Sequence, residues 1–432
     1  MSLRTAPAPS VRLVLPSLAD VAAGLTTLAV LVVFLVSAKV LQWAGLPYAT
    51  PGGSALAKFH PATFLSLAAL AVTALAVGPG RLVAWLALQR PGLVAFGFAI
   101  VLLLFQVVAV QKLPVSAVAD TFVMPLALFI AISALADRPA GRLATMLHVL
   151  FFVNSAIGYV EYLTGFRLTP NFINGEVVTY DWRATALFGH PLSNALLTGV
   201  YLLVLTGSGG RRFDIAMRAF LVVFNIGAMA AFGGRAATVA VLGLLALRGV
   251  VAGLKLIAGA RFSRRGVVSV TVALTLVGTI GTVAILAGFA DSFLDRFQND
   301  YGSAGTRIAM FHIFDGANWH DRIFAPDLGQ ITANQHRLGL AIAIESFVVA
   351  FLAYYGVVTT VLFFAGVIAF SAEIVRSSGR AALLPLVYYF AVSSTSTGIA
   401  NKTIDLAMIT AMLLLLLDRR FLPEGPKGSV AC

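Results

Sequence analysis

Charged residues and cysteine are both scarce in this 432-residue chain. Charged residues make up 11% of the sequence, hydrophobic residues make up 59%, and the mean hydropathy is +0.93. Because a soluble domain carries about 25% charged residues, this composition excludes a water-soluble globular fold. The single cysteine, Cys432, excludes an intrachain disulfide and a cysteine zinc cluster.

Long apolar segments recur along the whole sequence instead. A membrane-spanning helix needs about 20 predominantly apolar residues, and the alternating pattern of a transmembrane barrel is missing. The sequence therefore predicts an all-α polytopic integral membrane protein, with one membrane domain over residues 1–432. About twelve spans are expected, near residues 21–44, 61–78, 92–110, 119–136, 143–163, 188–207, 215–232, 236–257, 267–290, 345–371, 381–398 and 402–418.

Lysine and arginine predict how the chain is oriented in the membrane. With a cytoplasmic N-terminus, roughly two thirds of the 30 basic residues fall in cytoplasmic connections, as the positive-inside rule requires. Short basic turns such as GGRRFD and ARFSRR are the clearest markers of that side. Both termini are therefore expected in the cytoplasm, and the net charge of +12 needs no nucleic-acid partner to explain it.

Two predicted loops on the outward side differ from these short basic turns. They cover residues 164–187 and 291–344, and the second lies between the ninth and tenth predicted spans. A loop as long as the second is well beyond an ordinary connection and indicates function. Since it also holds many of the polar residues suited to chemistry, we expect the active site on the outward side.

Outward arginines oppose the positive-inside bias and are candidates for anion binding. A guanidinium group stays charged and pairs with two phosphate oxygens at once. Arg235 follows Gly233 and Gly234, which predict a tight turn, and it begins a helix whose N-terminus also favours an anion. An interfacial anchor is the alternative role for Arg235. Arg183 lies shortly before a span, and an ordinary loop residue is its alternative.

The stretch GSAGTRIAMFHIF predicts a short interfacial helix. Thr306 is expected to cap it, with Arg307 in the first turn and Ile308, Phe311 and Phe314 on one apolar stripe. The alternative is a helix that only covers the bundle.

The stretch ANQHRLGLAIAIES holds the candidate acid and base groups. His336 is suited to proton exchange near neutral pH, and the neighbouring Arg337 favours its neutral form. Glu345 follows at the membrane edge, where a carboxylate is costly and usually functional. The alternatives are a capping or solvated role for His336 and an ion pair with an outward arginine for Glu345. The spacing of histidines and aspartates in the loop matches no metal motif, so no metal or other cofactor is expected.

Several of these motifs together resemble the O-antigen polymerase and O-antigen ligase superfamily. The resemblance is carried by DWRATALFGHPLSNA, FGGRAA, GTRIAMFHIF and ANQHRLGLAIAIESFVVAFLAYYGVVTTVLFF, and it covers residues 145–418. Within the superfamily, the likeness is closest to the exopolysaccharide polymerase branch with the VpsF-type polysaccharide biosynthesis proteins.

The resemblance implies a GT-C-like, metal-independent glycosyltransferase at the periplasmic face of a bacterial inner membrane. Such a polymerase transfers a glycan from undecaprenyl pyrophosphate to a sugar hydroxyl of another lipid-linked repeat unit. A ligase instead transfers it to lipid A core. The implied partners are the undecaprenyl-pyrophosphate-linked oligosaccharide, the lipid bilayer, a flippase and a chain-length regulator.

The resemblance also implies roles for particular residues. Arg183, Arg235 and Arg307 match the outward arginines that hold pyrophosphate, and Arg337 is placed with them. His336 is expected to be the general base, with Glu345 as a second catalytic residue. The ligase pattern has Asn and an aromatic residue after the histidine, whereas this chain has Arg337 and Leu338. This difference favours a polymerase and leaves Glu345, His190 and His320 as alternative bases.

Two other classes of function are compatible with the sequence. A transporter or flippase of the lipid-linked oligosaccharide would share the plan of spans, but transporters place key charges near the bilayer midplane and show internal repeats. Here most unusual charges lie at the outer edge, with Asp120 and Asp405 near the outer ends of spans as the exceptions. The third hypothesis is a non-catalytic subunit of an export machine, whose loops would be docking surfaces.

Overall fold

The structure is a computed structural model. It describes residues 16–50, 52–170, 172–173, 176–177, 182–259, 303–324, 326–340 and 344–417, and isolated positions between 264 and 291. Most of the predicted span 267–290, residues 292–302 of the second loop, and both predicted cytoplasmic termini lie outside the described residues.

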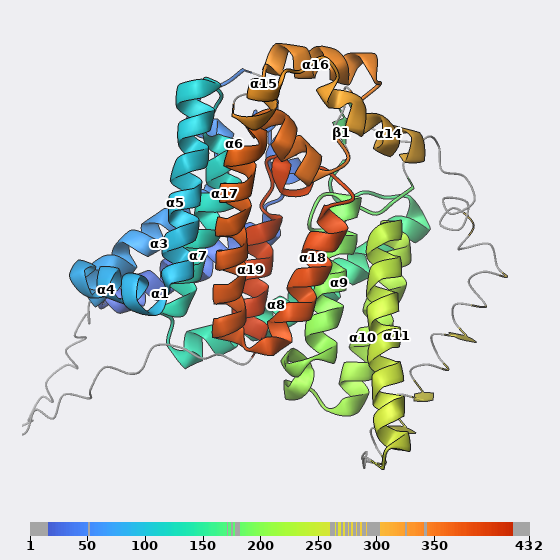
Figure 1. Ribbon diagram of the computed structural model, residues 1–432. Helices are drawn as coiled ribbons and strands as arrows, with labels where there is room; N and C mark the ends of the chain where they lie inside the picture. The colour runs from blue at the N-terminus through green and yellow to red at the C-terminus, as the bar shows by residue number, and fades with distance from the viewer. Residues whose placement is uncertain are drawn as a thin grey trace, which may run out of the picture.

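Helices dominate the described chain (Figure 1). The longer ones are α1 (Leu18–Leu35), α3 (Pro61–Val77), α4 (Pro79–Gln89), α5 (Pro91–Phe105), α7 (Met124–Ser133), α8 (Asp137–Thr164), α9 (Pro191–Thr206), α10 (Ile215–Phe232), α11 (Arg235–Ile257), α16 (Leu328–Arg337), α17 (Phe347–Ser378), α18 (Leu383–Ser393) and α19 (Asp405–Leu416). The shorter ones are α2 (Ala38–Trp43), α6 (Ser116–Val118), α14 (Ser303–Ala309) and α15 (Trp319–Ile323).

Tight and wide helical turns and one hairpin complete these elements. The 3₁₀ turns are η1 (Leu56–Lys58), η4 (Ser208–Arg212), η5 (Met310–Phe314), η6 (Arg380–Ala382) and η7 (Gly398–Ala400). The π-helical turns are η2 (Gln106–Val110) and η3 (Ala119–Val123). In the hairpin, β1 (Phe172–Ile173) pairs antiparallel with β2 (Glu176–Val177), inside the predicted loop 164–187.

Proline and glycine set several of the helix boundaries. Pro61, Pro91 and Pro191 begin α3, α5 and α9, since proline has the φ of a first helical turn and lacks an N–H that would have no acceptor there. Gly78, with a φ of 95°, joins α3 to α4, and the two helices meet at 102°. α3 therefore does not continue straight into α4.

The helices have the length and composition of membrane spans. Within the described residues, seven helical segments are long and apolar enough to cross a membrane, or eight if the bent α3 and α4 pair is one span. Each predicted span other than 267–290 overlaps at least one helix. The span 21–44 is divided between α1 and α2, and α9, α18 and α19 are shorter than the candidate membrane spans. Large apolar side chains such as Phe98 and Leu247 are exposed, as expected where lipid replaces water. This is the architecture of a polytopic helical membrane protein, while the number of about twelve spans stays a prediction.

The helices α9 and α19, which are short for membrane spans, form the centre of the bundle. Residues 406–416 of α19 are all buried, and α9 is buried over most of its length. α19 packs against α1, α7, α8, α9 and α17, while α9 packs against α10, α11 and α18. Because protein surrounds these two helices, their backbone does not need to match the bilayer thickness by itself.

We call the end of the bundle that carries α14, α15 and α16 the loop face; it is at the top of Figure 1. α17 is interrupted near this face at Gly356, whose φ of 74° and ψ of 171° are not helical. A Cβ at Gly356 would lie 2.8 Å from the carbonyl oxygen of Ile323. Glycine therefore allows both the break in α17 and the close packing of α15 against it.

The helix that carries Arg307 differs from its prediction. α14 begins at Ser303, so Thr306 lies inside the helix and the predicted cap at Thr306 is wrong. Met310 and Ile313 are the buried apolar residues, whereas Ile308 and Phe311 are exposed. The chain tightens to a 3₁₀ turn at η5, with three residues per turn, so the stripe predicted from a regular α-helix does not describe the buried face.

Candidate functional site

A cavity of about 580 Å³ lies at the loop face and is lined by charged side chains from distant parts of the sequence. They are Lys39, Arg183, His190, Arg235, Arg307, Glu345, Lys402 and Asp405. Five of these residues are cations and two are carboxylates, so the cavity has the charge to attract an anionic headgroup. We call it the arginine cavity after Arg183, Arg235 and Arg307.

Arg235 is placed by a tight turn between α10 and α11. Gly233 ends α10 in the left-handed conformation, and α11 begins at Arg235, as predicted. A Cβ at Gly234 would lie 2.4 Å from the Cβ of Ala195, so only glycine allows this turn to lie directly on α9. The first N–H groups of α11 and its dipole add to the positive potential beside Arg235.

Arg183 lies in a segment that is fixed by backbone hydrogen bonds. The N–H of Ala184 donates to the carbonyl of Ala231 at 3.0 Å, next to the α10–α11 turn. The N–H of Thr185 donates to the Oε2 atom of Glu161 at 2.7 Å. These contacts tie the segment to α8 and α10, so Arg183 projects from a fixed support.

Glu161 is a supporting residue that the sequence reasoning missed. Its side chain is fully buried near the end of α8, and it accepts hydrogen bonds from the N–H groups of Leu168, Thr185 and Ala186 at 2.7 to 3.0 Å. Both carboxylate oxygens of Glu161 therefore accept hydrogen bonds from loop N–H groups that would otherwise have no acceptor. The available signal was a carboxylate inside the predicted span 143–163.

Arg307 and Glu345 form an ion pair in the wall of the cavity. The Arg307 Nε atom lies 3.5 Å from the Glu345 Oε2 atom, and the side chains are 47% and 39% exposed. This confirms the ion pair that was the alternative role for Glu345. An exposed pair contributes only about 0 to 1 kcal/mol, so it orients Arg307 more than it stabilises the fold.

His190 lies at the start of α9 and faces the cavity. Its Nδ1 atom accepts a hydrogen bond from the N–H of Leu192 at 3.3 Å, which assigns the proton of the neutral ring to Nε2. The Nδ1 atom is therefore occupied and the Nε2 atom carries the proton. In this tautomer, the neutral ring is poorly placed to act as a general base.

The remaining predicted residues do not line the cavity. His336 is exposed in the last turn of α16. Arg337 pairs with Asp315, with 3.2 Å between the Arg337 Nη2 and Asp315 Oδ2 atoms. His320 is 76% exposed on α15. The structure thus separates His336, the predicted base, from the three arginines that it was expected to serve.

Asp405 is the first residue of α19 and lines the same cavity. Its Oδ2 atom accepts a hydrogen bond from the Ser193 hydroxyl at 3.2 Å, and its own N–H donates to the Thr403 hydroxyl at 3.2 Å. Because α9 and α19 pack together in the core, Ser193 and Asp405 approach each other at the helix starts. The site therefore contains a carboxylate that the sequence reasoning noted only as an exception.

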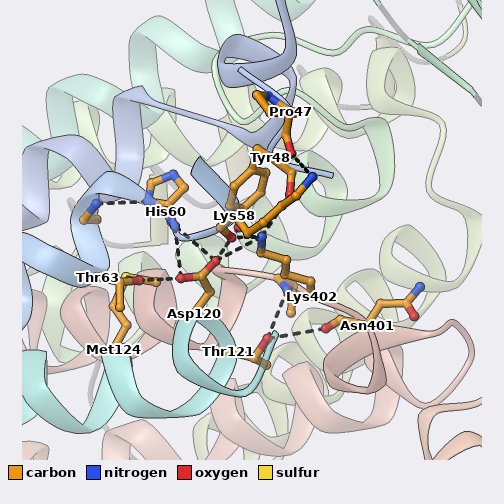
Figure 2. A network of polar contacts seen from close by, with 12 residues as sticks. Pro47, Tyr48, Lys58, His60, Thr63, Asp120, Thr121, Met124, Asn401 and Lys402 are labelled. Carbon is orange, nitrogen blue, oxygen red and sulfur yellow. Dashed lines mark hydrogen bonds and ion pairs between the residues drawn. The ribbon is translucent and has the colours of Figure 1, made fainter. Parts of the chain in front are cut away.

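A buried network around Asp120 forms another part of the wall (Figure 2). The carboxylate accepts from the Tyr48 hydroxyl at 2.9 Å, the Thr63 hydroxyl at 2.6 Å and the His60 N–H at 3.0 Å. The Lys402 ammonium lies 3.5 Å from the Asp120 Oδ2 atom. Asp120 is fully buried in the π-helical turn η3, so this carboxylate is held entirely by protein groups.

Lys402 is occupied by protein contacts as well. Its ammonium donates to the carbonyl oxygens of Tyr48, at 3.0 Å, and of Lys58, and it lies 3.4 Å from the centroid of the Tyr48 ring. Burial lowers the pKa of Lys402, and the charge of Asp120 opposes that effect. Lys402 therefore joins the segment around Tyr48 to the loop before α19, and its role is structural.

A second cavity, of about 690 Å³, shares this wall. Ala38, Tyr48, Asn401 and Lys402 line both cavities. The Asp120 network consequently fixes the partition between two spaces at the loop face.

Comparison with known proteins adds no relative: no protein-family model, curated protein or solved structure matches the chain. Among the described residues, no group of three or more His, Cys, Asp or Glu side chains is placed to hold a metal ion. The arginine cavity is therefore the feature that indicates what the site can bind.

Proposed function

We propose that the protein is a membrane glycosyltransferase of the polysaccharide polymerase type. It joins a glycan carried on undecaprenyl pyrophosphate to a sugar hydroxyl of a second lipid-linked repeat unit. The observation that carries the proposal is the convergence of Arg183, Arg235 and Arg307, from three separate segments, on one cavity at an end of a membrane helix bundle.

The reaction explains why such a cavity needs several guanidinium groups. Breaking the bond between the sugar and the lipid pyrophosphate leaves a diphosphate, on which negative charge develops in the transition state. Fixed donors aimed at that charge stabilise the transition state without having to reorganise. Arg235 and the N-terminus of α11 supply such donors together, Arg183 is held by the segment fixed to Glu161, and Arg307 is oriented by Glu345.

The proposal includes the orientation of the bundle. The end opposite the loop face carries Arg211 and Arg212 in η4, Arg376 near the end of α17, and Arg380 in η6. Basic residues are retained on the cytoplasmic side of short connections. The loop face is accordingly periplasmic, the chain is a multi-pass protein of a bacterial inner membrane, and both termini are cytoplasmic.

A transporter of the same lipid is the second candidate function. Its supporting observation is the discontinuous backbone, with α17 broken at Gly356 and α3 bent sharply against α4. Broken helices are common at the substrate sites of transporters. Three residues that line the arginine cavity, however, lie at the starts of α9, α11 and α19: His190, Arg235 and Asp405. This favours chemistry or binding at one face of the bundle.

The decisive experiment supplies purified protein in nanodiscs with undecaprenyl-pyrophosphate-linked repeat units, without added metal. Wild-type protein should produce a ladder of longer lipid-linked glycans. Arg235→Ala and Arg307→Ala should each lower the rate by roughly 100-fold, because each removes a donor from the developing diphosphate. Lysine at either position should retain part of the rate, since it keeps the charge and loses the two-pronged contact.

Arg81→Ala is the matched control, because Arg81 is an exposed arginine on α4 outside the cavity. It should leave the ladder unchanged. A wild-type protein that moves the lipid across sealed vesicles and never lengthens the glycan would replace the polymerase with the transporter. A parallel reaction that also contains lipid A core tests the ligase, and transfer to lipid A core alone would make the protein a ligase.

A further inference from the structure

The charged groups of the arginine cavity are not equivalent as proton acceptors. Of its two carboxylates, Glu345 is paired with Arg307. The Nδ1 atom of His190 already accepts a hydrogen bond from the α9 backbone, so it is not available to take a proton. His336 does not line the cavity at all. Deprotonation of an acceptor hydroxyl within this cavity therefore needs another group.

Asp405 has the properties that such a group requires. It lines the cavity, is partly buried, and has no cationic side chain within 4.0 Å among the described residues. Ser193 donates to its Oδ2 atom at 3.2 Å, which leaves further lone pairs on the carboxylate for a substrate hydroxyl. Asp405 begins α19 and Ser193 lies in the first turn of α9. The following turns of both helices are buried in the core, so the carboxylate is fixed relative to the bundle.

The position of Asp405 at a helix start also fits this role. Its backbone is anchored in the first turn of α19, and its carboxylate lines the cavity. Asp120, by contrast, is also a carboxylate near the outer end of a span, but it is fully buried and held by Tyr48, His60 and Thr63. The structure thus separates a supporting carboxylate from one that faces the cavity.

We infer that Asp405 is the general base of the proposed glycosyl transfer and that Ser193 is its positioning residue. This inference rests on the proposed function. The acceptor hydroxyl gives its proton to the Asp405 carboxylate as its oxygen forms a bond to the anomeric carbon of the donor sugar. The bond from that carbon to the pyrophosphate oxygen breaks, and the undecaprenyl diphosphate leaves with the electron pair. Asp405 then releases the proton to water.

The test measures glycan elongation and undecaprenyl pyrophosphate binding on the same nanodisc preparations. Asp405→Asn should lower the elongation rate by roughly 100-fold or more, the size expected for loss of a general base. Its binding of undecaprenyl pyrophosphate should stay within about twofold of wild type, because the arginines that hold the diphosphate are intact. Asp405→Glu should recover part of the rate and move the acidic limb of the rate-against-pH profile.

Asp137→Asn is the matched control, since Asp137 is exposed in the first turn of α8 and lies outside the cavity. Ser193→Ala provides a second variant if Asp405→Asn does not fold. It should lower the rate by roughly 10-fold with unchanged binding, because the base loses its orienting hydrogen bond.

The outcomes distinguish the two proposals. Elongation within threefold of wild type in a folded Asp405→Asn protein would overturn the inference and leave the polymerase intact. Parallel loss of binding and elongation in that variant would make Asp405 a structural residue and also overturn the inference. Absence of elongation in wild-type protein would instead overturn the proposed function.

Discussion

Asp120 shows how one buried carboxylate can fix the wall of a cavity through its contacts with protein groups. Three segments meet at its carboxylate: the chain around Tyr48, the start of α3 at Thr63, and the loop that carries Lys402. A buried carboxylate is costly unless its oxygens are fully paired. Here the hydroxyl, N–H and ammonium donors supply that pairing, and the same contacts hold the partition between the two cavities.

Replacing Asp120 with asparagine should destabilise the protein. The asparagine amide keeps one acceptor oxygen, and its NH₂ group replaces the other acceptor with a donor that faces the existing donors. Lys402 also loses its charged partner. Losing these contacts should cost about 2 to 4 kcal/mol. The apparent melting temperature in detergent should fall by several degrees, whereas Asp137→Asn, an exposed change of the same kind, should leave it unchanged. Equal melting temperatures for the two variants would show that the network contributes little.

At the scale of elements, the α10–α11 turn is the part of the site with the least room for change. Gly233 needs a left-handed conformation, with a φ of 66°, and Gly234 lies against Ala195 of α9. The turn therefore couples the packing of two helices to the position of Arg235.

Gly234→Ala should disturb both stability and ligand binding. Its Cβ would lie 2.4 Å from the Cβ of Ala195, so α9 and α11 must move apart and Arg235 must shift with them. Such overpacking costs about 1 to 3 kcal/mol. Melting temperature and undecaprenyl pyrophosphate binding should both decrease.

Gly243→Ala, within α11, is the matched control. A Cβ at Gly243 has no neighbouring atom within 4 Å, and alanine is the better helix former. This variant should bind normally and melt at the same or a slightly higher temperature. If Gly234→Ala behaved like Gly243→Ala, the close packing of the turn would not control the position of Arg235.

At the scale of the whole molecule, the two ends of the bundle differ in chemistry. The loop face carries α14 to α16 and the arginine cavity, whereas the other end carries the basic turn η4 and the basic end of α17. The asymmetry is the basis for placing the loop face in the periplasm.

Cysteine labelling in intact cells tests this orientation. In a Cys432→Ser background, Ala333→Cys on α16 should react with a membrane-impermeant maleimide. Ala136→Cys, at the turn before α8, should react only after the cells are permeabilised. Both alanines are exposed and the two changes are chemically identical, so only their location differs. The reverse pattern would place the arginine cavity in the cytoplasm and contradict the polymerase proposal.

Composition and local pattern determined the class of fold and most of the helix positions. Apolar runs of about 20 residues have few structures open to them in lipid, since every backbone N–H and C=O must be paired within the segment. The turn at Gly233 and Gly234 could also be predicted from the local sequence, because glycine is the residue that tolerates the left-handed conformation of Gly233. The sequence also indicated Arg183, Arg235, Arg307 and Glu345, which now line one cavity.

Only the tertiary structure decided which of the candidate groups belong together. His336 and Glu345 are close in sequence, yet only Glu345 lines the cavity, because α16 ends at Arg337 and its exposed last turn leaves His336 outside. Asp405 and Ser193 are far apart in sequence and meet because α9 and α19 pack together in the core. Such contacts depend on how whole helices pack, and they cannot be predicted from the spacing of residues along the sequence.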